Sequence, residues 1–228
     1  MTRLPGSSPA SVRVPAILTV LVLAGGLLFA PAARADTFAA GSYILPSDTV
    51  YQDSGGLRVY GLLYALLKAD VPVQWTIAAG KVKDGIDFTA TTTIIGGSQT
   101  ATSRNYAGGP WVVAAADAPA ALPVITTWRT ANPTTNVHTA TAQFTANVER
   151  TLWAAPPIAV AVDDEEDIAF GYLNAAGIPD RVPQAWPSGR LNSYTAYPDV
   201  LTMSAIAGTT GSASDGALFT AAGLPRYA

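Results

Sequence analysis

Cysteine is absent from this sequence of 228 residues, and histidine occurs once, at His138. Without cysteine the chain has no disulfide bond, no thiol nucleophile and no cysteine for a lipoprotein anchor. A single histidine excludes a histidine-rich zinc site. A chain without disulfide bonds must depend on its hydrophobic core for stability.

Basic residues are also few. The 13 Lys and Arg residues are outnumbered by 16 Asp and Glu, and no basic cluster occurs. Nucleic acids and anionic membrane surfaces attract concentrated positive charge. We therefore expect no nucleic-acid partner.

The N-terminus has the pattern of a secretory signal peptide. Arg3 and Arg13 precede an uncharged apolar run at residues 14–30, and residues 33–35 read Ala-Arg-Ala, a small-x-small cleavage site. We predict a signal peptide at 1–35, then a single α/β domain at 36–228, with no membrane contact after cleavage. The alternative is a retained N-terminal anchor. The mature part has 193 residues and, because three Arg are lost, a net charge of −6. We expect a bacterial protein that is secreted or lies in the periplasm or cell envelope.

The stretch from 42 to 77 indicates the fold class. A short apolar run at 43–45, an amphipathic helix at 57–68 and a second apolar run at 73–78 form the pattern of a β-α-β unit. Leu57, Tyr60, Tyr64 and Leu67 have helical spacing and are the expected inner face. The pattern predicts an α/β fold with a mainly parallel sheet and helices on both faces.

The rest of the chain adds elements to this sheet. Strands are expected at 111–114, 158–162 and 199–203, and helices at 118–131 and 168–176. Residues 88–105, with a Gly-Gly turn at 96–97, predict a β-hairpin excursion at the edge of the sheet. A strand-like run at 217–221 comes just before the end, which indicates either an edge strand or a sequence that continues beyond Ala228.

Polar residues directly follow the first predicted strand. Asp48, Thr49 and Asp53 are expected near its carboxyl end, where open α/β sheets usually place their ligands. They are our candidate ligand-binding residues. The structural alternative is that both aspartates form Asx turns that satisfy loop backbone groups.

An acidic run at 163–167 follows the predicted strand at 158–162. Asp163 and Asp164 are candidate ligands for Mg²⁺ or Ca²⁺, together with Asp48 or Asp53 across the crevice. The alternative is helix capping, since carboxylates stabilise the first turn of a helix. No cofactor other than such a cation is expected.

Known catalytic motifs are absent from residues 36–228. The sequence contains no Walker motif, no G-x-G-x-x-G and no G-x-S-x-G, and His138 lies in a strand-like run that favours a structural role. Four tryptophans could instead form a stacking surface for sugars or peptides. They are Trp111, Trp128, Trp153 and Trp186.

Three segments carry a resemblance to a known group. Residues 43–53, 108–113 and 169–179 resemble uncharacterised exported bacterial proteins with a class I glutamine amidotransferase-like fold, which is flavodoxin-like and Rossmann-like. Such amidotransferases use a nucleophilic cysteine with a later His and Glu. Because this chain has no cysteine, the resemblance implies a fold and transfers no catalytic residue.

The sequence therefore leaves several functions open. We expect an exported, non-catalytic binding or structural module whose partner is a small molecule, a glycan or a peptide. The first alternative is a divalent-cation-dependent, hydrolase-like enzyme that uses carboxylates at the carboxyl edge of the sheet. The second is a truncated, inactive enzyme.

Overall fold

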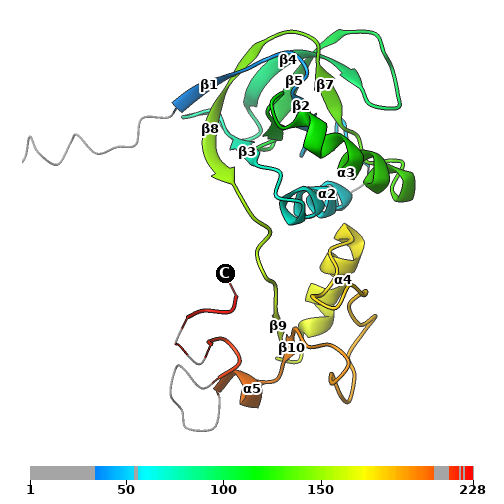
Figure 1. The fold of residues 1–228 in the computed structure, drawn as a ribbon, viewed down its shortest axis with the longest axis vertical. Helices are drawn as coiled ribbons and strands as arrows, with labels where there is room; N and C mark the ends of the chain where they lie inside the picture. The colour runs from blue at the N-terminus through cyan, green and yellow to red at the C-terminus, as the bar shows by residue number, and fades with distance from the viewer. Residues whose placement is uncertain (1–33, 54–55, 208–215, 221, 223, 228) are drawn as a thin grey trace, which may run out of the picture. The chain divides into compact units, whose positions relative to one another are not determined.

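A curled sheet of eight strands is the main feature of the structure, a computed structural model (Figure 1). The structure describes residues 34–53, 56–207, 216–220, 222 and 224–227. The chain divides into two units, Met1–Ala32 and Ala33–Ala228, and all of the described residues belong to the second. Apart from residues 34 and 35, the predicted signal peptide lies outside the described residues.

Every neighbouring pair of strands in this sheet is antiparallel. The spatial order is β1-β8-β3-β6-β2-β7-β4-β5. The strands are β1 (Arg34–Phe38), β2 (Tyr43–Leu45), β3 (Val73–Thr76), β4 (Ile86–Ile94), β5 (Thr102–Ala107), β6 (Trp111–Val113), β7 (His138–Ala140) and β8 (Phe144–Leu152). Two helices accompany them, α2 (Leu57–Lys68) and α3 (Ala118–Ala131).

The predicted mainly parallel α/β sheet is therefore wrong. Strands β2 and β3 flank α2 as expected, but β6 lies between them and is antiparallel to both. Strands β2 and β3 are thus parallel without touching, which is a split β-α-β unit. Strands β6 and β7 flank α3 in the same way, with β2 between them. The two units interleave, and the fold is mostly β. The flavodoxin-like, Rossmann-like and amidotransferase-like resemblance is wrong for the same reason.

The burial of the strands explains why the sequence pattern indicated a parallel sheet. All three residues of β2 and all three of β6 are buried. Continuous burial is typical of parallel strands that are covered on both faces. Here the same burial arises because helices cover one face of an antiparallel sheet and the curled sheet itself encloses the other.

Helices α2 and α3 cover one face of the sheet (Figure 1). Val59, Leu62 and Leu66 of α2 and Ile125 of α3 pack with the strand residues Leu45, Val73 and Trp111 in one core cluster. The predicted inner face of α2 was largely wrong. Of its four residues only Leu67 is buried, and Tyr60 is 45% exposed.

The opposite face holds an aromatic core. The rings of Phe88 in β4 and Phe144 in β8 stack with centroids 5.0 Å apart, although four strands separate β4 from β8. In a flat sheet these strands would lie about 24 Å apart. The sheet therefore curls into a half-barrel, and Phe38 and Tyr106 extend the stack inside it.

The C-terminal segment has a small core of its own. Strands β9 (Val160–Ala161) and β10 (Val200–Leu201) form a parallel pair, accompanied by α4 (Glu166–Ala176) and α5 (Met203–Ala207). Val160, Phe170, Trp186 and Val200 are buried together. The expected buried strand at 158–162 is thus only a two-residue strand outside the main sheet.

Helix α2 packs closely against α3 and α4. A Cβ atom at Gly61 would lie 2.0 Å from the carbonyl oxygen of Ala176 and 2.4 Å from the ring of Trp128. Only glycine allows that approach. This packing brings the end of α2 toward the C-terminal segment, where the candidate site lies.

Several local predictions are confirmed. The helix at 118–131 matches α3, and the hairpin is β4 and β5 at the sheet edge. Gly177 ends α4 with a φ of 77°, in the left-handed region that suits glycine. No helix within the described ranges is long and apolar enough to cross a bilayer.

Candidate functional site

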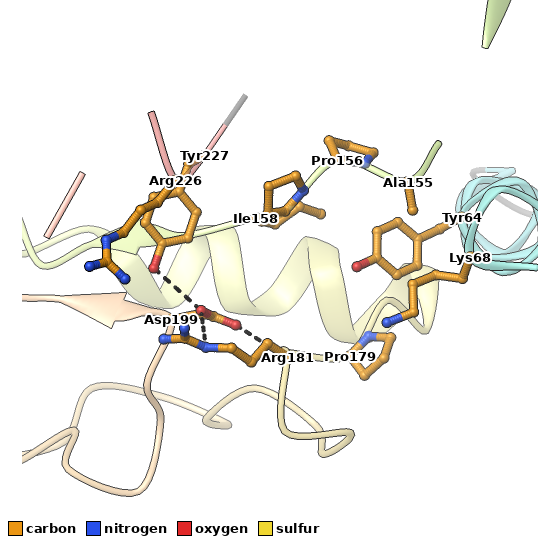
Figure 2. Close-up of a pocket in the computed structure, with 11 residues that line it drawn as sticks. Tyr64, Lys68, Ala155, Pro156, Ile158, Pro179, Arg181, Asp199, Arg226 and Tyr227 are labelled. Atoms are coloured by element: carbon orange, nitrogen blue, oxygen red, sulfur yellow. Dashed lines mark hydrogen bonds and ion pairs between the residues drawn. The ribbon is translucent and has the colours of Figure 1, made fainter. Parts of the chain in front are cut away.

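A cavity of about 390 Å³ lies where the end of α2 meets the C-terminal segment. Figure 2 shows Tyr64 and Lys68 at one end, Arg226 and Tyr227 at the other, and Asp199 with Arg181 between them. The lining residues are Tyr64, Lys68, Ala155, Pro156, Pro157, Ile158, Pro179, Arg181, Asp199, Arg226 and Tyr227. Three of these side chains are cationic and one is acidic, so the wall carries net positive charge.

The acidic residue is a buried structural anchor. Asp199 is 3% exposed, and its Oδ1 lies 2.9 Å from Nε of Arg181. Its Oδ2 accepts a hydrogen bond of 2.7 Å from the backbone N–H of Arg181. Arg181 also donates from Nη2 to the carbonyl of Pro198 at 2.8 Å. The carboxylate therefore fixes Arg181 in the wall and neutralises it.

The last described residues close the far end. A β-bridge between Phe219 and Pro225 brings the chain back on itself, and Arg226 Nε donates to the carbonyl of Phe219 at 2.6 Å. Tyr227 donates a long hydrogen bond of 3.4 Å to Oδ1 of Asp199. These contacts hold Arg226 and Tyr227 beside the buried carboxylate.

Helix α2 supplies the near end. Tyr64 and Lys68 are four residues apart on α2, so both side chains lie on one side of the helix. The ammonium group of Lys68 makes no hydrogen bond or ion pair with any residue that the structure describes. Lys68 is therefore the cation most available to a ligand.

The two tyrosine hydroxyls stay protonated at neutral pH. Burial raises the pKa of Tyr64 above its ordinary value of 10.0, and the charge of Asp199 adds to the rise. Burial likewise raises the pKa of Tyr227. Both groups can therefore donate hydrogen bonds, although Tyr227 already faces Asp199.

Two other hollows are less suited to a charged ligand. The groove between α2 and α3 is lined by Ala65, Pro123, Val124, Thr127, Trp128, Ala131 and Asn132, none of which is charged. The second hollow lies at the carboxyl ends of the parallel strands β9 and β10, where ligands of α/β sheets usually bind, and Tyr194 and Thr202 contribute to it.

The expected tryptophan surface is not assembled, because Trp111 and Trp186 are buried and Trp153 is 69% exposed.

The predicted ligand-binding residues lie elsewhere, in the loop after β2. Asp48 accepts hydrogen bonds from the backbone N–H groups of Val50 and Ala107, at 2.9 Å and 3.3 Å, the first of which closes an Asx turn. Asp53 accepts a 2.6 Å bond from Thr134, and Thr49 is exposed. None of Asp48, Thr49 and Asp53 lines the cavity at Asp199. Their role in ligand binding stays a prediction.

The predicted metal ligands precede α4. Asp163 accepts a 3.0 Å bond from the backbone N–H of Glu165, and Asp164 has a φ of 74°. Arg190 lies 3.2 Å from Asp167 and pairs more loosely with Glu165. Among the described residues no group of three or more His, Cys, Asp and Glu could hold a metal ion. A Mg²⁺ or Ca²⁺ site at Asp163 and Asp164 stays a prediction.

The single histidine is buried in the half-barrel. His138 is fully buried, and its Nδ1 lies 2.7 Å from the hydroxyl of Tyr106, which also bonds Thr92 at 2.9 Å. Burial, aided by the nearby charge of Arg104, lowers the pKa of His138 to about 4. Burial raises the pKa of Tyr106 to about 12. At neutral pH both groups are uncharged parts of the core, in line with the expected structural role.

The residues of the cavity carry no recognisable pattern in the sequence. Lys68 and Asp199 are far apart in the chain, as are Arg181 and Arg226, and no spacing links them. From the sequence, the only role predicted for Lys68 is a favourable positive charge in the last turn of a helix. Only Asp199 could be expected to be buried, because it is followed by the apolar residues Val200 and Leu201.

We compared the chain with protein-family models, curated proteins and solved structures, and no match was found in any of the three.

Proposed function

We propose that the chain is an exported binding module that holds a small organic anion in the cavity at Asp199. The observation that carries the proposal is the ammonium of Lys68, which pairs with no residue that the structure describes and lies in a wall with two further cations. A concave site of several hundred Å³ with a few fixed polar groups is typical of small-molecule binding. Cations that line such a cavity attract anionic ligands.

The lining favours binding over catalysis. Both carboxylate oxygens of Asp199 already accept hydrogen bonds or ion pairs, so this group is a poor general base. The lining residues that the structure describes include no His, Ser, Thr or Cys that could act as a nucleophile or proton carrier. The fixed charges instead suit a protein that binds its ligand and releases it chemically unaltered.

Export rests on the sequence. The basic start, the apolar run and the Ala-Arg-Ala site form a signal-peptide pattern at residues 1–35. An exported module of this kind would meet its ligand outside the cytoplasm.

The test compares two lysine variants by calorimetric titration. Lys68→Met removes the unpaired charge in the cavity, whereas Lys83→Met removes an exposed charge in the loop before β4. The probes are hexanoate, benzoate, glucuronate and inorganic phosphate. We expect at least one to bind saturably and Lys68→Met to weaken it about 10- to 100-fold, which is the usual value of a charged hydrogen bond.

The control sharpens the outcome. Lys83→Met should leave the affinity unchanged, because both variants alter the net charge equally. The proposal fails if no probe binds at about 10 mM. It fails equally if the two variants weaken binding to the same extent, since the effect would then be one of overall charge.

A further inference from the structure

We infer that the ligand is a carboxylate carried on an apolar body, rather than a phosphate or a sugar acid. This inference rests on the proposed anion-binding function and specifies the class of ligand for the same cavity. Three observations support it: the wall that faces the body of the ligand, the hydroxyl groups of the wall, and the position of the unpaired charge.

The apolar part of the lining offers no side-chain hydrogen bonds. It consists of Ala155, Ile158 and three prolines, Pro156, Pro157 and Pro179, the last of which lies beside Lys68 and Arg181 (Figure 2). Proline also lacks a backbone N–H donor. Figure 2 shows Pro156 and Ile158 across the cavity from Asp199. An apolar group would be buried favourably against this wall.

A sugar would leave polar groups unsatisfied there. Among the described residues, no Asn, Gln, Ser or Thr lines the cavity. The side-chain hydroxyls are those of Tyr64 and Tyr227, and the second already donates to Asp199. A buried hydroxyl without a partner costs binding energy, so several sugar hydroxyls are disfavoured.

The position of Lys68 favours a single negative charge. Phosphate sites usually present several N–H donors, from a helix N-terminus or an arginine fork. Lys68 is instead the last residue of α2, at the end of the helix where the dipole is negative. Arg181 is engaged by Asp199, and Nε of Arg226 by the carbonyl of Phe219. A carboxylate therefore fits this end better than a dianion.

The experiment measures selectivity on the unmodified chain by calorimetry. Its probes are hexanoate, benzoate, inorganic phosphate, glucuronate and the uncharged benzyl alcohol. We expect hexanoate or benzoate to bind at least about tenfold more tightly than each of the other three. Because no substitution is needed, a folding defect cannot obscure the result.

The outcomes separate this inference from the proposed function. If phosphate or glucuronate binds as well as the apolar carboxylates and Lys68→Met weakens it, the anion site stands and the inference on ligand class is overturned. If benzyl alcohol binds as well as benzoate, the charge is not used and both fail. If none of the probes binds, both fail as well.

Discussion

Acidification should destabilise this protein through its one histidine. His138 lies fully buried on β7, with Nδ1 2.7 Å from the hydroxyl of Tyr106 and the ring of Tyr51 in edge contact at 5.1 Å. Its other ring nitrogen, Nε2, has no hydrogen-bond partner among the described residues. The charged group that acts on the ring is Arg104, which disfavours a second positive charge. Protonation in the folded state is therefore costly.

The magnitude follows from the shift in pKa. The pKa of His138 falls from 6.5 to about 4 on folding. At about 1.4 kcal/mol per unit, such a shift corresponds to roughly 3 kcal/mol of stability. That stability is fully present above pH 6.5 and is lost as the pH falls toward 4, since only the unfolded chain binds the proton in this window. Domains are stable by about 5–15 kcal/mol, so the loss is substantial.

The assay is urea unfolding of the wild type and His138→Gln between pH 7 and pH 4. Glutamine cannot be protonated, so the wild-type free energy of unfolding should fall more steeply, by up to about 1.4 kcal/mol per pH unit at its maximum. Carboxylates titrate in both proteins and cancel in the difference. NMR of the imidazole Cε1–H adds a direct reading, because the chain contains one histidine.

Two results would refute this reasoning. One is an equal pH dependence of stability in the wild type and His138→Gln. The other is an imidazole signal that titrates with a midpoint near 6.5 in the folded protein, since a buried, uncharged ring should not accept a proton there.

Two further predictions concern packing and export. Gly61→Ala should lower the free energy of unfolding by about 2–4 kcal/mol, because its Cβ would overlap Ala176 and Trp128. Gly171→Ala, in open space on α4, should be neutral or stabilising by up to about 1 kcal/mol, and equal urea midpoints for the two variants would contradict the packing. Mass spectrometry of the protein expressed with its leader in a bacterial host should show a mature N-terminus at Asp36. Cleavage there keeps Asp36 of β1, which pairs with Ala146 of β8. A chain that keeps residues 1–35 would contradict cleavage.

Local structure was largely predictable from the sequence, whereas strand pairing was not. Helical periodicity, turn glycines and proline positions placed α2, α3 and the hairpin of β4 and β5 close to where they lie. These signals depend on neighbours within a few residues. The inserted position of β6 between β2 and β3 depends on contacts between distant segments, and no local pattern encodes it.

The prediction of which face of α2 is buried was wrong for a related reason. Tyr60 and Tyr64 are apolar enough to join the stripe of an inner face, but the sheet buries Val59, Leu62 and Leu66 instead. Tyr60 contacts Trp111 edge-to-face from the flank of the helix, and Tyr64 lines the cavity. A helix with apolar residues on several sides has no unique inner face until its partners are known.

The candidate site was the least predictable part. Asp48 makes the Asx-turn contact that was its structural alternative. The structural alternative for Asp163 was to cap a helix, but the N-cap of α4 is Glu165, and Asp163 instead accepts a bond from the backbone N–H of Glu165. Lys68 and Asp199 carried no motif, because their association depends on the packing of α2 against the C-terminal segment. Sites assembled from distant segments leave little trace in a single sequence.

The most direct test of the anion site is an NMR titration of the ¹⁵N-labelled chain with benzoate. We expect saturable shifts in the backbone amides of Tyr64, Lys68, Ile158 and Arg181, which surround the cavity, and little change in the half-barrel around His138. The Lys68→Met variant should lose these shifts at the same benzoate concentration. Saturable shifts confined to the loop at Asp48 or to residues 163–167, with none at the cavity, would contradict the account.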